Sequence, residues 1–183
     1  AYTENYLANS GLNFVFLRNS QYAEAMITSY FATRDTANLL TSCQGDGHMS
    51  YISRIDCAKA AMYALMRDDL YYATLNINGP ESMTLADFVE TGNAVTGLSV
   101  KINNVTEEET YAAFDAIGVP RNTDGDFSKS PIKATSEGMV TFGTTVTQGY
   151  LDVPVSDFSS LTGRKPLSIQ YIFEHVDDYL LGD

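Results

Sequence analysis

The chain has 183 residues, 44% of them hydrophobic, which suits one domain or slightly more with a core of its own. Its formal net charge of −12 disfavours nucleic-acid binding, because a surface that contacts phosphates needs clustered Lys and Arg. No apolar stretch approaches the ~20 residues of a membrane-spanning helix. Composition therefore predicts a cytoplasmic protein that binds neither nucleic acid nor membrane.

The cysteines and histidines predict neither a disulfide framework nor a metal site. Cys43 and Cys57 are the two cysteines, and no Cys/His cluster has the spacing of a zinc site. Both cysteines are expected to be reduced thiols. Cys57 stands in an Ala-rich helical segment and is expected to be a small core residue.

The first part of the chain predicts a helix, a buried strand and a polar loop. The helix pattern ends at Ser10-Gly11, where a left-handed cap is typical. Residues 14–17 form an unbroken apolar run, as a strand buried on both faces requires. The polar residues Arg18, Asn19 and Ser20 follow at its carboxyl end, the edge where open α/β sheets bind ligands.

The next elements alternate in type. We expect a helix over 23–31, a turn at Gly45-Asp46-Gly47, a strand at 49–52, a helix up to residue 66 and a strand over 72–77. Asp56 lies in the first turn of that helix or at its N-cap, where a carboxylate can meet unpaired amides. The residues Asn78-Gly79-Pro80 then predict a turn.

Helices dominate the second half of the sequence. Thr84 and Asp87 resemble a capping box that opens a helix ending at Gly97. A strand over 99–105, a helix from 106 to 118, a loop over 121–130, a helix over 136–150 and a last helix capped by Ser168 are expected to follow. This order of elements predicts the α/β class.

The glycine spacing bears on cofactor binding. None of the 13 glycines forms the G-x-G-x-x-G pattern that brings backbone amides onto a pyrophosphate. The nearest candidate, around Gly45 and Gly47, follows polar residues and is better explained as a turn before a strand. We therefore expect no dinucleotide-phosphate cradle in these residues.

Four segments together carry a family resemblance. They are the runs SGLNFVFLRN (10–19), SRIDCA (53–58), NGPESMTL (78–85) and LTGRKP (161–166). Their order resembles that of NmrA-like atypical short-chain dehydrogenases, particularly the NAD(P)H-dependent quinone oxidoreductases. The resemblance implies that residues 1–183 are the C-terminal portion of a Rossmann-like NAD(P)-binding fold with a small α+β substrate-side lobe. It also implies that the N-terminal dinucleotide-binding half is absent from the chain.

The same resemblance suggests site residues. It places Arg18, Asn19 and Ser20 beside the nicotinamide end of NADP or NAD, and Tyr22 in the wall of the substrate pocket. His48 follows the glycine turn and is a further candidate on the substrate side. The residues themselves leave an alternative open for two of these roles. Arg18 could form a salt bridge instead of binding the cofactor, and Tyr22 could pack on its own helix instead of lining a pocket.

No catalytic pair is evident in the chain. Ordinary short-chain dehydrogenases use Tyr-x-x-x-Lys, in which the Lys lowers the Tyr pKa. Here Tyr2 is followed four residues later by Tyr6, and the adjacent Glu4 is interpreted as a solvated helix residue. In this atypical group, chemistry rests mainly on orienting the reactive cofactor.

These observations support three functional hypotheses. The first is the substrate-side portion of an enzyme that passes a hydride from NAD(P)H to a small quinone-like acceptor, with the isolated portion inactive. The second is a non-catalytic NAD(P)-sensing regulatory or protein-binding module of the NmrA-like kind, and the third is a bare interaction module. A homo-oligomer is compatible with all three.

Overall fold

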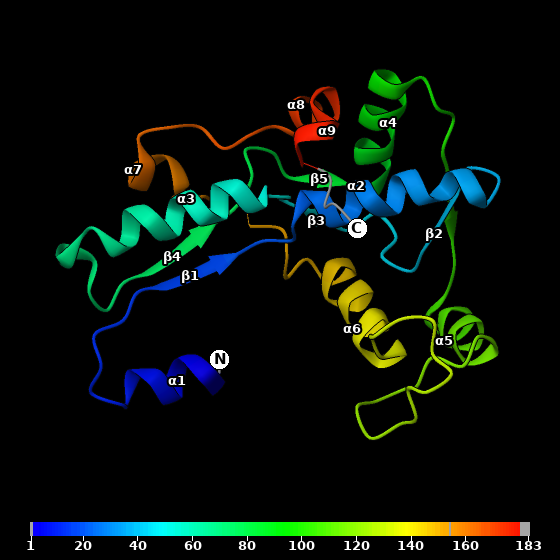
Figure 1. Cartoon of the computed structure of the whole chain (residues 1–183), viewed down its shortest axis with the longest axis horizontal. Helices are drawn as coiled ribbons and strands as arrows, with labels where there is room; N and C mark the ends of the chain where they lie inside the picture. Colours follow the sequence, from blue (N-terminus) through cyan, green and yellow to red (C-terminus); the bar gives the residue numbers. More distant parts are fainter. Residues whose placement is uncertain (1, 154, 180–183) are drawn as a thin grey trace. The chain divides into compact units, whose positions relative to one another are not determined.

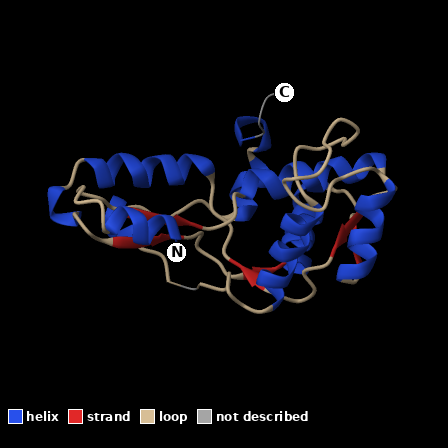
Figure 2. Cartoon of the chain, turned by 90° about the horizontal axis from the view of Figure 1, so that it is seen from below, coloured by secondary structure: helices blue, strands red, loops and turns tan. Residues whose placement is uncertain are grey.

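The computed structural model describes residues 2–153 and 155–179. The chain divides into two compact units. The first comprises Ala1–Thr28, Ser50–Ser82 and Val153–Asp183, and the second comprises Ser29–Met49 and Met83–Asp152. Short strands and more extensive helices make up both units (Figure 2). The predicted mixed α/β class is confirmed.

The first unit is built around a pair of parallel strands (Figure 1). These are β1 (Phe16–Asn19) and β4 (Thr74–Ile77), in register with Phe16 opposite Thr74. The helices that accompany them are α1 (Tyr2–Ala8), the start of α2 (Ala23–Ala32), α3 (Arg54–Leu65), the short helix η2 (Asp68–Leu70), α7 (Phe158–Thr162), α8 (Ile169–Glu174) and α9 (Val176–Tyr179).

The core of this unit lies between α3, α7 and the two strands. It consists of Ile52, Cys57, Ala60, Ala64, Ile77, Phe158 and Leu161. Cys57 is a buried free thiol, as expected from its Ala-rich segment. Burial, reinforced by the nearby Glu24 and Asp56, raises the pKa of the Cys57 thiol to about 12.

Strand β1 differs from its prediction in position and in burial. It starts at residue 16 instead of 14, because pairing with β4 begins where the Phe16 amide donates to Ala73 O (2.9 Å). Val15 and Leu17 pack against the core. On the other side, Phe14 and Phe16 stack with ring centroids 4.2 Å apart, and all four side chains are only partly buried. The prediction of a strand buried on both faces is therefore wrong for the described residues.

The second unit contains two further strand pairs. Strand β2 (Leu39–Ser42) runs parallel to β6 (Lys101–Asn104), and β3 (His48–Met49) is antiparallel to β5 (Met83–Thr84). The helices of this unit are the end of α2, the short helix η1 (Thr33–Asp35), α4 (Leu85–Thr96), α5 (Glu107–Ala116) and α6 (Ser136–Thr147).

Local signals placed the helix ends of the second unit well. Thr84 and Asp87 form the predicted capping box, and α4 ends at Gly97 with φ 72°. The turn at 45–47 is also confirmed, with φ 52° at Gly45. Gly143 of α6 packs closely on Cys43, the residue that follows β2. A Cβ added at Gly143 would lie 2.5 Å from Cys43 Sγ.

The last predicted helix is divided in two. Helix α8 begins after its Ser168 N-cap as expected, but it ends at Glu174, and α9 starts at Val176. His175 leaves the helical conformation, with φ −122°, and stays on the surface stacked on Tyr171. The spacing of Ile169, Ile172, Phe173, Val176 and Leu180 predicts one apolar stripe along this helix, and its last member, Leu180, lies outside the described residues. Across residues 2–153 and 155–179, no helix has the length and apolar character that a bilayer crossing requires.

Candidate functional site

The carboxyl end of β1 opens into the predicted binding loop. The Ser20 amide donates to Ile77 O at the end of β4 (3.0 Å). The Ile52 amide then donates to Gln21 O (3.0 Å), and the Ala23 amide donates back to Ile52 O (2.9 Å). These backbone bonds fix residues 20–23 between β4 and the segment that leads into α3. Four of the five predicted site residues thus lie at this edge, Arg18 and Asn19 at the end of β1 and Ser20 and Tyr22 in the loop that follows.

Arg18 has a carboxylate partner. Its Nε and Nη2 donate to the two carboxylate oxygens of Glu4 in α1, at 2.8 and 2.7 Å. This hydrogen-bonded pairing lowers the pKa of Glu4 and raises the pKa of Arg18. The structure therefore shows the salt bridge that was the alternative role of Arg18. Glu4 is paired with Arg18 and is not simply solvated. An anion at Arg18 would have to compete with Glu4 for the guanidinium.

Asn19 and Ser20 offer free polar groups at the strand end. Asn19 is exposed and Ser20 is partly exposed. Among the residues that the structure describes, neither the Asn19 amide group nor the Ser20 hydroxyl has a hydrogen-bond partner. Both side chains can therefore donate to a ligand without breaking an internal bond.

Tyr22 presents its ring at the surface of the loop. It is 36% exposed, and the Arg54 guanidinium carbon lies 5.2 Å from the ring centroid. Its backbone makes an isolated parallel bridge with Ile52. Arg54 begins α3, so the ring is flanked by a cation from a different helix. The sequence reasoning missed Arg54, because only the fold brings residues 22 and 54 together.

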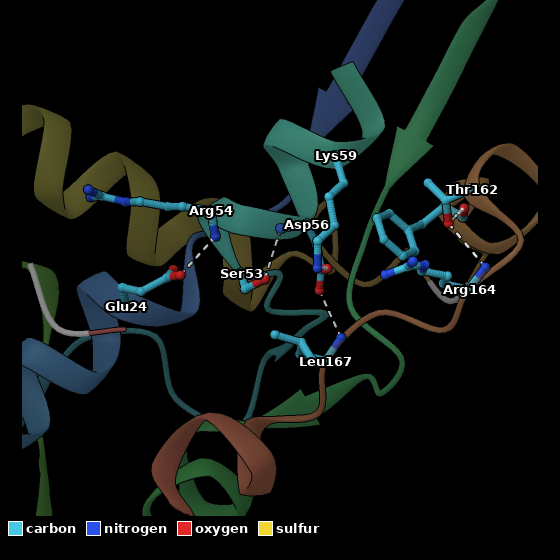
Figure 3. A network of polar contacts seen from close by, with 9 residues as sticks. Glu24, Ser53, Arg54, Asp56, Lys59, Thr162, Arg164 and Leu167 are labelled. Atoms are coloured by element: carbon cyan, nitrogen blue, oxygen red, sulfur yellow. Dashed lines mark hydrogen bonds and ion pairs between the residues drawn. The ribbon is translucent and has the colours of Figure 1, made fainter. Parts of the chain in front are cut away.

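Glu24 is a second residue that the sequence did not single out. Its side chain is buried, and its Oε1 accepts from the Arg54 amide (2.9 Å) at the N-terminus of α3 (Figure 3). A carboxylate there is favoured by the helix dipole. Its Oε2 has no hydrogen-bond partner within the described part of the chain. Glu24 therefore ties the start of α2 to the start of α3.

Asp56 connects α3 to the C-terminal segment. Ser53 is the N-cap of α3, and its Oγ accepts from the Asp56 amide (3.1 Å). The Asp56 carboxylate instead accepts from the Leu167 amide (2.8 Å) and contacts Lys59 Nζ (3.4 Å), as Figure 3 shows. Asp56 thus lies in the first turn of α3, one of its two predicted positions, while Ser53 is the N-cap and the Asp56 carboxylate binds the C-terminal segment.

The turn after β4 completes this edge of the sheet. Asn78 is buried, and its Nδ2 donates to Val153 O (3.2 Å) and Val155 O (2.8 Å). Gly79 lies against the Tyr51 carbonyl with no space for a Cβ. This turn is therefore closely packed between Tyr51 and the segment at Val153 and Val155.

His48 belongs to the second unit, whereas the other four predicted site residues belong to the first. It is exposed on β3, opposite Thr84 of β5. Hydrogen bonds from Thr84 are the main cause that lowers the pKa of Asp87, and His48 makes a smaller contribution in the same direction. Within residues 2–153 and 155–179, no group of His, Cys, Asp and Glu side chains could hold a metal ion.

The roles of the five candidates stay predictions. They are cofactor binding for Arg18, Asn19 and Ser20, and substrate binding for Tyr22 and His48.

Comparison with solved structures identifies the fold. The chain superposes on the NADPH-complexed quinone oxidoreductase QOR2 of Escherichia coli with a TM-score of 0.81 at 22% identity, covering 96% of this chain and 57% of that one. The fold is that of Rossmann-like NAD(P)-binding proteins. The edge that carries residues 18–22 is the ligand-binding edge in folds of this kind.

Comparison with curated proteins gives relatives of the predicted type. The chain is 26% identical to quinone oxidoreductase 2 of E. coli over 75% of this chain and 48% of that protein. It is 27% identical to agroclavine dehydrogenase of Claviceps fusiformis (94% and 57%). It is 24% identical to the NmrA-like family domain-containing oxidoreductase flvB of Aspergillus flavus (90% and 50%). No family model matches the chain.

These relatives confirm the resemblance to NmrA-like and quinone oxidoreductases that the four motifs indicate. The chain spans about half the length of the curated relatives it matches.

Proposed function

We propose that the chain is the substrate-side portion of an NAD(P)H-dependent oxidoreductase that reduces a quinone-like acceptor. The observation that carries this proposal is the loop at the carboxyl end of β1. There the polar residues Asn19 and Ser20 are followed by Tyr22, whose ring is exposed. The names of the relatives, all of them oxidoreductases or dehydrogenases, support the same class of reaction.

The residues present fit one end of a nicotinamide dinucleotide. Asn19 and Ser20 would hold the nicotinamide side through hydrogen bonds, since their side chains are uncommitted among the described residues. The glycine pattern needed to cradle the pyrophosphate does not occur in the sequence. We therefore propose that the chain is the C-terminal portion of a longer cytoplasmic protein whose other half supplies that cradle. The bound cofactor would supply the hydride.

Tyr22 and Arg54 would bind the acceptor. A planar acceptor can stack on the Tyr22 ring, and the Arg54 guanidinium 5.2 Å from that ring gives a positive charge beside it. Such a charge would favour an acceptor that becomes negative when it receives a hydride. The chain thus contributes orientation and charge at the acceptor.

An NAD(P)-sensing module is the second candidate function. No Tyr-x-x-x-Lys pair occurs in residues 1–183, a feature that a sensor shares with the atypical enzymes of this kind, so a measurement has to separate the two. The two candidates differ in one measurable property. An enzyme oxidises NAD(P)H when an acceptor is added, whereas a sensor binds the cofactor and leaves it unchanged.

We predict that Tyr22→Ala raises the KM for a quinone about fivefold in the longer protein while the affinity for NADPH stays nearly unchanged. The expected cause is the loss of ~1 kcal/mol of stacking on one substrate only. Steady-state kinetics gives the KM, and calorimetry gives the cofactor affinity. Tyr22→Phe should keep the stacking, and Tyr150→Ala, at a 71% exposed site in the second unit, is the matched control. An equal loss of cofactor affinity would place Tyr22 on the dinucleotide instead.

A further inference from the structure

Helix α3 has apolar side chains on two opposite faces. Its inner face contributes Cys57, Ala60 and Ala64 to the core of the first unit. Its other side carries exposed apolar residues at a spacing of three or four, the period of one helix face. We call this set the outer stripe: Ile55, Ala58, Met62, Leu65 and Met66.

All members of the outer stripe are exposed among the described residues. Leu65 is 87% exposed and Met66 is 73% exposed, and Ile55 and Met62 are about half exposed. The charged neighbour Lys59 contacts the Asp56 carboxylate within its own chain. A continuous exposed apolar stripe on a chain of net charge −12 is typical of an interaction surface.

The charges at the two ends of α3 indicate which partner fits. Arg54 stands at the N-terminal end, and Asp68 and Asp69 stand just beyond the C-terminal end. Arg67 already pairs with Asp69 (2.6 Å), which leaves the C-terminal end with a net negative charge. A second α3 running antiparallel would bring Arg54 of each copy to the acidic end of the other.

The same alignment also matches the apolar side chains. Position 61 lies midway between Arg54 and Asp68, and the outer stripe, from 55 to 66, has nearly the same centre. In the register set by Arg54 and Asp68, position 55 of one copy lies opposite position 67 of the other, so Ile55 comes next to Met66, and the outer stripes of the two copies overlap along most of their length. A two-fold axis near position 61 therefore lets the opposite charges meet at both ends while the apolar stripes overlap between them.

We propose that the outer stripe of α3 binds the outer stripe of a second copy of the chain, antiparallel about a two-fold axis near Ala61. Each copy uses the same surface, as two-fold dimers do. One helix face is small compared with the ~1,200–2,000 Å² buried in stable complexes, so the dimer is weak, with a dissociation constant on the order of 10 μM or above.

Sedimentation equilibrium of the 183-residue chain tests this surface. We expect a monomer–dimer equilibrium that Leu65→Glu converts to monomer at all concentrations. Tyr150→Glu, at a 71% exposed site outside the first unit, is the control and should leave the equilibrium unchanged. Both side chains are exposed, so circular dichroism should show unchanged melting for both variants. A wild-type chain that is monomeric throughout, or a Leu65→Glu variant that still dimerises, overturns the proposal.

Charge reversal tests the antiparallel register. Arg54→Glu alone and Asp68→Arg alone should each weaken dimerisation about tenfold, and the two substitutions in one chain should restore it, since opposite charges then meet again. Failure of the double variant to recover overturns the proposed alignment. Loss of association in Tyr6→Glu, with Leu65→Glu still dimeric, would move the contact to α1 and likewise overturn it.

Discussion

Gly79→Ala is expected to abolish stable folding of the first unit. An added Cβ would overlap the Tyr51 carbonyl oxygen and lie 2.8 Å from its carbonyl carbon. Both atoms belong to backbone that is fixed by the Gly79 amide bond to Ser50 O (3.3 Å) and by the pairing of Ile52 with Gln21. Because no flexible side chain can move aside, we expect a loss of more than ~4 kcal/mol in the free energy of unfolding. Urea denaturation followed by circular dichroism measures it.

Gly97→Ala is the matched control for this glycine substitution. Gly97 adopts φ 72°, but an added Cβ there would meet no atom within 4 Å. The expected cost is only the ~1–2 kcal/mol of placing a side chain in the left-handed region. If Gly79→Ala lowers the free energy of unfolding no more than Gly97→Ala does, the turn after β4 is not closely packed on Tyr51.

The second large effect is expected for Asp56→Ala. The substitution leaves the partly buried Leu167 amide without its acceptor and removes a buried carboxylate from the first turn of α3. An unsatisfied buried donor costs about 1–3 kcal/mol, and the lost charge–dipole interaction adds about 0.3–1 kcal/mol. We therefore expect a loss of about 2–4 kcal/mol, which lowers Tm by roughly 5–15 °C in a chain of this size.

Two comparisons isolate the role of the Asp56 carboxylate. Asp56→Asn keeps an acceptor oxygen for Leu167 and should lose less stability than Asp56→Ala. Asp115→Ala removes an exposed carboxylate that pairs with Arg121, and a surface ion pair contributes about 0–1 kcal/mol. Equal losses for Asp56→Ala and Asp115→Ala would contradict the connection between α3 and the C-terminal segment.

Elements with local sequence signals were predictable from the sequence. The capping box of Thr84 and Asp87 and the left-handed Gly97 lie within a few residues of the helix ends that they determine. Their conformations depend on backbone hydrogen bonds between near neighbours. The same locality explains why the helix after Thr106 was placed correctly.

Contacts between distant residues were not predictable. The Asp56 carboxylate meets an amide 111 positions away, and Arg54 lies over Tyr22 only because β1, α2 and α3 converge. Strand β1 was displaced by two residues because apolar periodicity reports burial and does not report where a partner strand begins. For the candidate site, the sequence thus indicated residues 18–22, and the fold added Glu24 and Arg54.

The central claim is that these residues form the substrate side of an NAD(P)H-dependent oxidoreductase. The most direct measurement is NADPH oxidation, followed at the nicotinamide absorbance, with and without a quinone. We expect the 183-residue chain alone to bind NADPH poorly and to show no oxidation, because it lacks the phosphate-cradling glycines. The longer protein, with that half restored, should bind NADPH and oxidise it when quinone is added. Cofactor binding without oxidation by any quinone tested would contradict the claim and favour the sensing module.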